Sequence, residues 1–253
     1  MPTPYSTHVY DEVTSTQDVA RELSELGPVL VVASRQTAGR GRSGASWETA
    51  PRALAMSLRF DPFEWPSDRR TLIPLATGIA VARLFDLSLK WPNDLLLPLE
   101  GEEQVVFLPP PGGETGHSPL RGEKKVGGIL AEASGREVTL GIGLNLWWPD
   151  PPPDRIGLFP EDPGPSAYAA IGSEMAEGVW TELAKGPERW SYDDYCDTCI
   201  TLGRKITWGD GHSGTALAID RFDGALIVED ANGARLNLKA GEIRHVRASP
   251  DPP

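Results

Sequence analysis

The sequence predicts an α+β protein with a small β module at its C-terminal end. Up to about Leu202, stretches with helical apolar spacing alternate with short apolar runs that are typical of buried strands. From Leu202 onward, short β runs are separated by Gly-Asp and Asn-Gly turns, which is the pattern of antiparallel strands. We therefore expect two domains, residues 1–201 and residues 202–253, of which the second is a small antiparallel β-barrel.

Three helices are expected in the first domain. Hydroxyl residues at Thr14-Ser15-Thr16 can cap the first helix, and Gly27-Pro28 stops it. Apolar residues at helical spacing predict a second helix over residues 72–85 and a third over residues 175–183.

Strands are expected between these helices, at residues 29–34, 53–60, 126–134 and 137–146. Residues 87–97, LSLKWPNDLLL, predict a strand, a proline turn and a second strand. Residues 98–123 are rich in Pro, Gly and Glu, and residues 149–165 are rich in Pro. We expect both of these stretches to be long surface loops.

Composition excludes several classes of protein. The 253 residues carry a formal net charge of −12, which argues against broad affinity for DNA or for an anionic membrane. The two cysteines, Cys196 and Cys199, imply no disulfide framework, and one such pair cannot complete a tetrahedral metal site. The N-terminus has no signal-peptide pattern, and no apolar run approaches the length of a membrane span. We expect a cytoplasmic protein without a metal centre built from its own side chains.

The stretch QTAGRGRSG contains three glycines and two arginines within six residues, from Gly39 to Gly44. It fits G-x-G-x-x-G, but a dinucleotide fold needs a helix after the third glycine. Pro51 and the strand that follows leave no room for such a helix. Glycines let a backbone wrap closely around a ligand, and arginine offers a fork of donors for phosphate or carboxylate oxygens. The stretch therefore favours an anion clamp, with a solvated loop tip as the alternative.

Three further motifs accompany this loop: KWPNDLLL from Lys90, KKVGGILAE from Lys124, and GIGLN from Gly141. With Ser15-Thr16 and the glycine loop, they occur in an order and spacing that resemble the biotin protein ligase family. The resemblance covers roughly residues 10–247. It implies a mixed-sheet catalytic domain of the biotin/lipoate ligase type, followed by an SH3-like C-terminal barrel.

The resemblance also implies an activity. Such ligases form biotinyl-5′-AMP from biotin and ATP, with Mg²⁺ expected, and then transfer biotin to a lysine of a biotin carboxyl carrier protein. Because Ser15 comes so early, we expect no N-terminal DNA-binding domain, no DNA partner and no membrane partner. A monomer and a homodimer both remain open.

Site residues follow from the same resemblance. In the biotin pocket it places Ser15, Thr16 and Gln36 on the ureido head and Gly127, Gly128, Gly141 and Gly143 on the floor. Around the adenylate it places Gly39, Arg40, Gly41, Arg42, Trp47, Asn93, Lys125 and Asn145. The implied catalytic residues are Lys125, Arg40 and Asp94, and Glu242 is a weaker candidate for a nucleotide contact.

Structural roles compete with several of these assignments. Ser15 and Thr16 can serve only as helix caps, Trp47 can be core, and Asn93 and Asp94 can simply shape the turn. The nearest alternative function is a lipoate or octanoate ligase or transferase. The transferase type needs a nucleophile in the pocket, and neither cysteine falls near the motifs. The other alternative is a non-catalytic ligand-binding relative, which would require a broken motif, and none is found.

Overall fold

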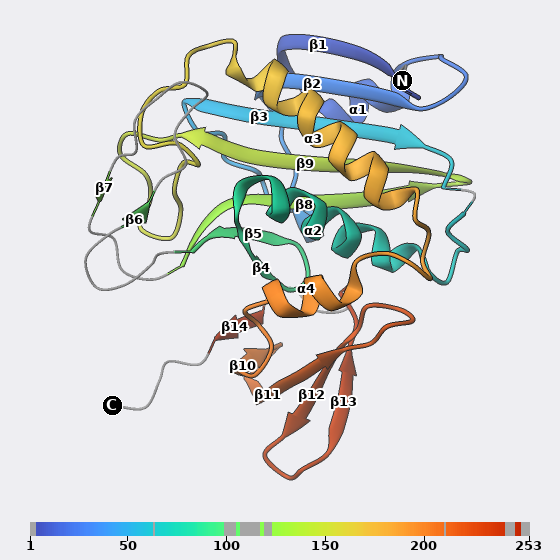
Figure 1. The fold of residues 1–253 in the computed structure, drawn as a ribbon, viewed down its shortest axis with the longest axis vertical. Coiled ribbons are helices and arrows are strands. Elements are labelled where there is room, and N and C mark those ends of the chain that lie inside the picture. The colour runs from blue at the N-terminus through green and yellow to red at the C-terminus, as the bar shows by residue number, and fades with distance from the viewer. Residues whose placement is uncertain are drawn as a thin grey trace.

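The computed structural model describes residues 4–62, 64–98, 105–106, 117–118, 123–209, 211–240 and 246–248. Its largest element is a seven-stranded mixed sheet with helices on both faces, and a second, antiparallel sheet lies below it in Figure 1. The α+β class is therefore confirmed. Glu242 and most of the Pro/Gly-rich stretch 98–123 lie outside the described residues.

The large sheet has the strand order β1-β2-β3-β9-β8-β5-β4. Only β1 and β2 pair in parallel, and all other neighbours are antiparallel. The strands are β1 (Ser6–Val13), β2 (Val29–Gln36), β3 (Arg52–Phe60), β4 (Ser88–Lys90), β5 (Asp94–Leu97), β8 (Lys124–Ser134) and β9 (Glu137–Trp147). Every predicted strand of this domain is confirmed, whereas β1 was not expected. Its side chains are exposed or half-buried throughout, so it lacks the apolar pattern of a buried strand.

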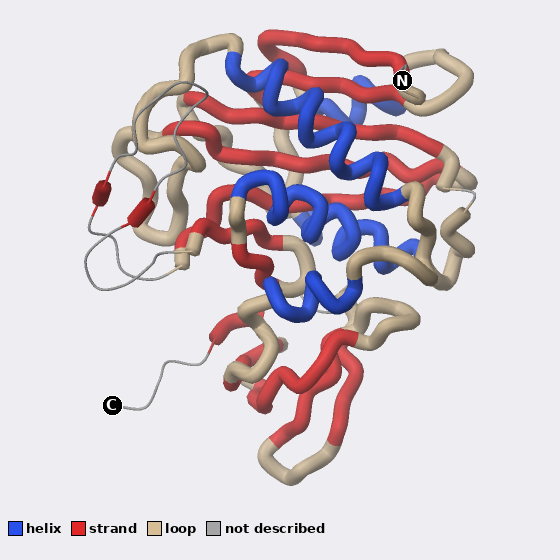
Figure 2. The backbone as a smooth tube through the Cα atoms, in the orientation of Figure 1, coloured by secondary structure: helices blue, strands red, loops and turns tan. Residues whose placement is uncertain are grey.

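Strand β2 shows why a continuous apolar run predicted a buried strand. Leu30 and Val32 face the main core under the helices, while Val29 and Val31 join a smaller cluster with Ala20 on the other face. Successive side chains of a strand point to opposite faces, so burying both faces requires apolar residues at every position. The main core is covered by α2 (Ile73–Phe85) and α3 (Ala167–Leu183), and the other face by α1 (Thr16–Glu22) (Figure 2).

The start of α1 differs from the predicted hydroxyl cap. Ser15 occupies the N-cap position in an extended conformation, but its side chain makes no capping hydrogen bond. The Thr16 backbone N–H instead donates to Gln36 Oε1 at 2.8 Å. The cap is thus supplied by the end of β2, a tertiary contact that local sequence does not reveal. The helix also ends at Glu22, before the expected stop at Gly27.

The Pro-rich stretch 149–165 forms no helix or strand and is largely exposed or half-buried, as expected of a loop, but its middle part is buried. Ile156, Leu158 and Phe159 are buried. The backbone N–H groups of Leu158 and Phe159 donate to the carbonyls of Asn145 and Leu146 at 2.8 Å each. The short apolar run IGLF thus docks on the end of β9. Within the other stretch, β6 (Val105–Val106) and β7 (His117–Ser118) form a small antiparallel pair.

The C-terminal residues form the predicted antiparallel module. Its five strands follow the order β13-β12-β11-β10-β14. They are β10 (Lys205–Trp208), β11 (His212–Ile219), β12 (Leu226–Asp230), β13 (Arg235–Leu238) and β14 (Val246–Ala248). Among the described strands this is an open sheet with β13 and β14 at its edges, so closure into a barrel stays a prediction.

The C-terminal module packs directly on the large sheet and shares its core. Trp91 is buried, and its indole N–H donates to the Gly224 carbonyl at 2.9 Å. The short helix α4 (Tyr192–Thr198) lies between the two parts (Figure 1), and the Tyr192 hydroxyl donates to the Ile219 carbonyl at 2.6 Å. One continuous apolar cluster runs through both parts. The two parts therefore share one core, and the division at residue 201 stays a prediction.

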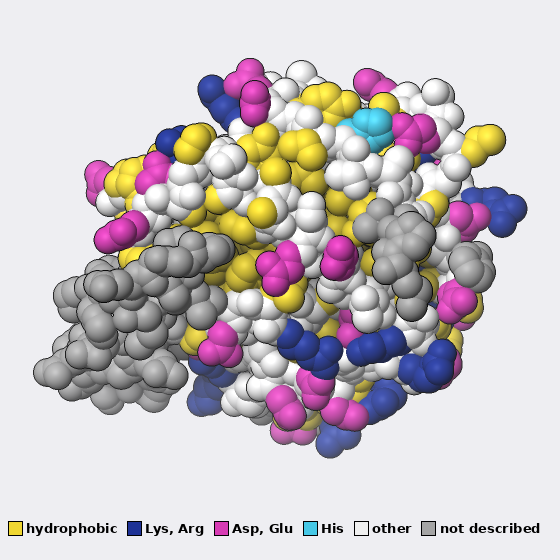
Figure 3. Space-filling view, turned by 45° about the horizontal axis from the view of Figure 1, so that its top comes forward, with side chains coloured by type: hydrophobic (Ala, Val, Ile, Leu, Met, Phe, Trp, Pro, Cys, Tyr) yellow, Lys and Arg dark blue, Asp and Glu magenta, His cyan; other side chains and the backbone are white. Residues whose placement is uncertain are grey.

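Charged side chains of both signs are found on the surface. On the face shown in Figure 3, acidic and basic side chains are interspersed among the residues drawn in colour. In the part of the chain that the structure describes, no helix is both long enough and apolar enough to cross a lipid bilayer.

Candidate active site

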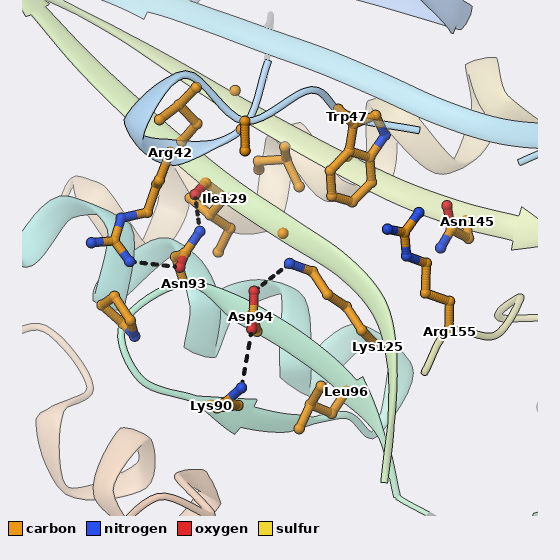
Figure 4. A pocket seen from close by; sticks show the side chains of 18 of the residues that line it. Arg42, Trp47, Lys90, Asn93, Asp94, Leu96, Lys125, Ile129, Asn145 and Arg155 are labelled. Carbon is orange, nitrogen blue, oxygen red and sulfur yellow. Dashed lines mark hydrogen bonds and ion pairs between the residues drawn. The ribbon is translucent and has the colours of Figure 1, made fainter. Parts of the chain in front are cut away.

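A cavity of about 610 Å³ collects most of the predicted site residues (Figure 4). Its walls come from the glycine loop after β2, the turn between β4 and β5, and the neighbouring strands β8 and β9. The predicted residues that line it are Thr16, Gln36, Arg40, Gly41, Arg42, Trp47, Asn93, Asp94, Lys125, Gly128, Gly141, Gly143 and Asn145.

Three predicted residues do not line the cavity: Ser15, Gly39 and Gly127. Gly127 was expected on the floor of the biotin pocket but does not line the cavity. Neighbouring residues of a strand point to opposite faces, and of the two glycines only Gly128 faces the cavity. A Cβ atom at Gly127 would lie 2.5 Å from Leu144 Cδ2 and 2.6 Å from the Gly143 carbonyl oxygen. Glycine is therefore needed at this position for the packing of β8 against β9.

An ion pair occupies the middle of the cavity. Asp94 accepts a hydrogen bond from Lys125 Nζ at 2.5 Å, and Lys90 Nζ lies 3.7 Å from its other oxygen. The proline turn places Asp94 at the first position of β5, opposite Gly128 of β8. Because Gly128 has no side chain, the carboxylate and the ammonium can meet above the sheet. Both groups stay partly exposed to the cavity, Asp94 at 21% and Lys125 at 32%.

Asn93 shapes the turn and also faces the cavity. Its Nδ2 donates to the Ile129 carbonyl at 2.9 Å, and its Oδ1 accepts from Arg42 Nη1 at 3.3 Å. The turn-shaping role and a ligand-binding role are therefore compatible for this side chain.

The glycine loop folds on itself between β2 and β3. The Gly41 N–H donates to the Ala45 carbonyl at 2.6 Å, and the Trp47 N–H donates to the Gly39 carbonyl at 2.9 Å. Ser43 and Gly44 have φ values of 54° and 77°, in the left-handed region that favours glycine. The loop contains only a single 3₁₀ turn, Arg42–Gly44, and leads into a strand. The dinucleotide-binding alternative therefore fails on geometry.

Both arginines of the loop are held by other parts of the protein. Arg40 forks onto Asp18, with Nη1 and Nη2 donating to the two carboxylate oxygens at 2.7 and 2.6 Å. This hydrogen bonding holds the pKa of the Asp18 carboxyl below its ordinary value. Arg42 donates to the Ala240 carbonyl of the C-terminal module, and burial lowers the pKa of its guanidinium. An anionic ligand would have to compete with these partners.

Two glycines of the cavity floor seat the indole of Trp47. A Cβ atom at Gly143 would lie 2.9 Å from Trp47 Cζ2, and one at Gly128 would lie 3.4 Å from Trp47 Cζ3. Gly141 seats Gln17 in the same way, with Gln17 Cδ 3.1 Å from the position of a Cβ atom. Protein side chains therefore form the first layer over the floor that the resemblance implies at these glycines.

One end of the cavity is a compact polar wall. Gln36 Oε1 accepts from both the backbone N–H and the hydroxyl of Thr16, at 2.8 and 3.1 Å. The Thr16 hydroxyl also lies 2.8 Å from the buried Ser57 hydroxyl. Gln17 Nε2 donates to two strand carbonyls at 3.3 Å each. These donors and acceptors suit a small polar head group with matching hydrogen bonds.

An acceptor without a partner lies elsewhere in the cavity. The Asn145 side chain is 2% exposed, and its Oδ1 has no hydrogen-bond partner among the described residues. A buried polar atom without a partner costs about 1–3 kcal/mol. Because Asn145 lines the cavity, a ligand that donates a hydrogen bond at this point would relieve that cost.

Several residues of the cavity were missed by sequence reasoning, namely Gln17, Glu48, Lys90, Glu123, Arg155 and Arg204. Gln17 follows the Ser15-Thr16 motif directly, so its position was a usable signal. Arg155 belongs to the Pro-rich stretch that was predicted to be a surface loop, and nothing local marks it. Cys196 and Cys199 do not line the cavity. Within the described ranges, no group of three or more His, Cys, Asp or Glu residues could hold a metal ion.

The sequence is similar to those of known biotin ligases. Residues 10–146 match the sequence profile of the biotin/lipoate A/B protein ligase family. The chain is 26% identical to the biotin--[acetyl-CoA-carboxylase] ligase of Mycobacterium tuberculosis, over 92% of this chain and 86% of that protein. It is 28% identical to the biotin--[acetyl-CoA-carboxylase] ligase of Paracoccus denitrificans, over 85% of this chain and 86% of that protein.

Solved structures share the fold. The biotin protein ligase of Aquifex aeolicus in complex with biotin and ATP superposes with a TM-score of 0.68 at 23% identity, covering 96% of this chain and 99% of that chain. The Leishmania major biotin protein ligase in complex with biotinyl-5-AMP gives a TM-score of 0.52 at 24% identity, covering 93% of this chain and 99% of that chain.

Proposed function

Because the chain belongs to the biotin/lipoate A/B protein ligase family, we propose that its cavity is the active site of a biotin protein ligase. The protein is an ATP-dependent enzyme that forms biotinyl-5′-AMP and then transfers biotin to a lysine of a carrier protein. The observation that carries the site assignment is the Lys125–Asp94 pair, which lies in the same cavity as a polar wall and an unsatisfied Asn145.

In the first step, a carboxylate oxygen of biotin attacks the α-phosphorus of ATP, and the bond to the leaving pyrophosphate breaks. Negative charge builds on the phosphoryl oxygens as this happens. Lys125 supplies a fixed ammonium for that charge, assisted by Arg40 from the glycine loop. Arg40 exchanges Asp18 for the ligand in this step, which a partly exposed ion pair permits.

The polar wall binds the biotin head. Thr16 and Gln36 offer donors and acceptors for the ureido group. Ser15 is buried directly before Thr16, at the N-cap position of α1. Gly141 keeps the floor low beneath this head, with Gln17 packed on it, whereas Gly128 and Gly143 lie under Trp47 toward the nucleotide. Gly127 serves this floor indirectly, through the close packing of its strand.

The nucleotide lies toward Trp47 and Asn145. Asn145 Oδ1 accepts from the exocyclic amine of adenine, which satisfies the buried acceptor. Gly39 and Gly41 hold the loop close to the phosphate, and Arg42 and Asn93 form its other side. Trp47 packs against the adenine end.

In the second step, the amine of the carrier lysine attacks the acyl carbon, and AMP leaves. Asp94 lies in the middle of the cavity and can accept a proton from that amine. A magnesium ion bound with ATP needs only one or two protein carboxylates, and Asp94 fits that requirement.

The names of the relatives support a proposal for the partner. The biotin carboxyl carrier protein of acetyl-CoA carboxylase is the proposed acceptor, because two relatives carry that enzyme in their names. We place the enzyme in the cytoplasm, with residues 1–201 as the catalytic domain and residues 202–253 as an SH3-like module. No DNA partner is proposed, in view of the net charge of −12.

The testing experiment is transfer of labelled biotin to a purified carrier domain, with lipoate as the competing substrate. Biotin-dependent labelling that needs ATP is expected. Labelling by lipoate but not by biotin would instead support the alternative ligase, and nucleotide binding without any labelling would support a non-catalytic relative.

Lys125→Ala provides the matching test of the site. Loss of one fixed charge-stabilising donor costs on the order of 10²–10³ in rate, so adenylate formation should fall by that factor. Lys124→Ala is the matched control, because Lys124 precedes it on the same strand and does not line the cavity. Synthetic biotinyl-adenylate should partly restore transfer by Lys125→Ala. Near-normal pyrophosphate release by that variant would contradict the assignment.

A further inference from the structure

Arg155 is a cation of the cavity that none of the sequence motifs contains. It belongs to the stretch 149–165, yet it lines the same cavity as Lys125, Trp47 and Asn145. Figure 4 shows its guanidinium pointing into the cavity beside Asn145, next to the side chain of Lys125.

The backbone fixes Arg155 directly beside Lys125. The Lys125 N–H donates to the Asp154 carbonyl at 3.0 Å, and the Ile156 N–H donates to the Lys125 carbonyl at 3.0 Å. These two bonds make a parallel bridge between Lys125 and Arg155. Side chains of residues paired in this way project to the same side of a sheet. Two cations are thus placed next to each other on one face.

The segment that carries Arg155 is anchored in the core. Ile156, Leu158 and Phe159, which follow it directly, are 3%, 0% and 6% exposed. The backbone of Arg155 is therefore held in position before any ligand arrives, and only the side chain has to move. This preorganisation lowers the entropic cost of a contact with a ligand.

Neighbouring like charges on paired residues repel each other, so each cation needs an anion. Lys125 has Asp94 at 2.5 Å, and Arg155 has Glu48 Oε2 at 2.6 Å, with Asp154 Oδ1 farther away at 3.9 Å. These two carboxylates differ in environment, because Asp94 is 21% exposed and Glu48 is 61% exposed. An ion pair with such an exposed carboxylate is weak and is readily exchanged for another anion.

We propose that Arg155 leaves Glu48 and binds a phosphate group of the nucleotide together with Lys125, an inference that rests on the proposed function. A phosphate has several oxygens and can accept from a guanidinium fork and from an ammonium at the same time. It also neutralises the two adjacent cations. Arg155 is thus a further nucleotide-binding residue, and Glu48 is its resting partner.

The test compares Arg155→Gln, Arg155→Lys and Glu48→Gln with the wild-type chain. Arg136→Gln is the control, because Arg136 is 86% exposed and its carboxylate partner at 3.2 Å, Asp61, is also outside the cavity lining. Biotin-dependent ATP–pyrophosphate exchange gives KM and kcat for ATP, and calorimetric titration with ATP gives binding without turnover.

Arg155→Gln should raise the ATP KM and Kd about 10- to 100-fold, the usual effect of losing a charge-assisted hydrogen bond. The biotin KM should stay unchanged. Arg155→Lys should recover part of the ATP affinity, because an ammonium provides a point charge for phosphate but not the guanidinium fork. Glu48→Gln should leave ATP affinity equal or improved, since it removes only the competing carboxylate.

If the Arg155–Glu48 ion pair had only a structural role, the variants would show a different pattern of ATP affinities. Arg155→Gln and Glu48→Gln would then weaken ATP binding equally, and that result would overturn the proposal. Wild-type affinity in Arg155→Gln would overturn it as well. If the wild-type chain showed no biotin-dependent exchange, the proposed function would fail, while the ATP titrations would still decide the role of Arg155.

Discussion

Trp47 holds its place in the cavity because two strand residues have no side chains. Gly143 and Gly128 both lie under its indole, and a Cβ atom at Gly143 would lie 2.9 and 3.0 Å from two of its ring carbons. Contacts of that length are repulsive, so the indole would have to move. Two positions earlier on the same strand, Gly141 makes the same arrangement with Gln17. The two glycines therefore make room for two different side chains of one cavity.

Gly143→Ala and Gly141→Ala should separate the two substrates. Gly143→Ala displaces Trp47, so the ATP KM should rise about tenfold, the effect of roughly 1.4 kcal/mol, while biotin binding holds. Gly141→Ala displaces Gln17 and should weaken biotin by a similar factor while ATP binding holds. Titration of each variant with each substrate provides the measurement. If both variants weakened the same substrate, the proposed assignment of the two ends would be wrong.

At the scale of elements, the two proline-rich stretches behave differently. The stretch 149–165 is packed against β9 through Leu158, which is completely buried. The stretch 98–123 joins β5 to β8, and the strand ends Leu97 and Lys124 are paired directly with each other. Antiparallel neighbours of this kind can be connected by a hairpin of only two to five residues.

Leu158→Ala should destabilise the protein by about 2–5 kcal/mol, the usual cost of removing a buried leucine side chain. Chemical denaturation measures this loss. Leu236→Ala is the control, because that leucine is 41% exposed on β13 and should change stability little. Equal stability of the two variants would show that the stretch 149–165 does not contribute to the core.

Replacing residues 100–122 with a short Gly-Ser turn should leave the fold intact. A doubling of loop length changes the closure free energy by only about 0.6 kcal/mol, so a shorter loop should cost nothing. Glu123 is kept, because it lines the cavity and pairs with Arg204 at 2.7 Å. The thermal midpoint is the measurement, and a large drop would mean that the removed residues pack on the body.

At the scale of the whole molecule, the C-terminal module is joined to the large sheet through α4. Tyr192 donates its hydroxyl proton to the Ile219 carbonyl at 2.6 Å, and its ring stacks under the Arg221 guanidinium at 4.0 Å. Burial, with a smaller contribution from Cys196, raises the pKa of Tyr192 to about 12. The neutral phenol is therefore the form that holds the two parts together.

Stability should fall at alkaline pH in a way that depends on Tyr192. Because its pKa is raised on folding, its contribution is fully present below the ordinary value of 10.0 and is lost as the pH rises through about 12. Tyr192→Phe should lose about 1 kcal/mol at neutral pH and show a flatter decline in stability above pH 10. Denaturation curves across this range compare the two chains, and identical slopes would contradict this role.

The sequence by itself determined the elements and the family. Apolar periodicity and turn residues predicted the strands β2, β3, β8 and β9, the helices α1, α2 and α3, and the antiparallel C-terminal module, while five ordered motifs predicted the family. These signals are local, because side-chain periodicity and turn chemistry depend on neighbours in the chain. Most of the site residues that the motifs predicted do line the cavity.

Only the tertiary structure decided which residues meet. The cap of α1 by Gln36, the docking of residues 156–159 on β9, and the pairing of Arg155 with Glu48 all join segments that are distant in sequence. Strand β1 escaped prediction because it is an edge strand without a buried face. Alternation along β8 turned Gly128 into the cavity and Gly127 into the core. Such choices depend on sheet register and on packing partners, and a stretch of sequence read alone contains neither.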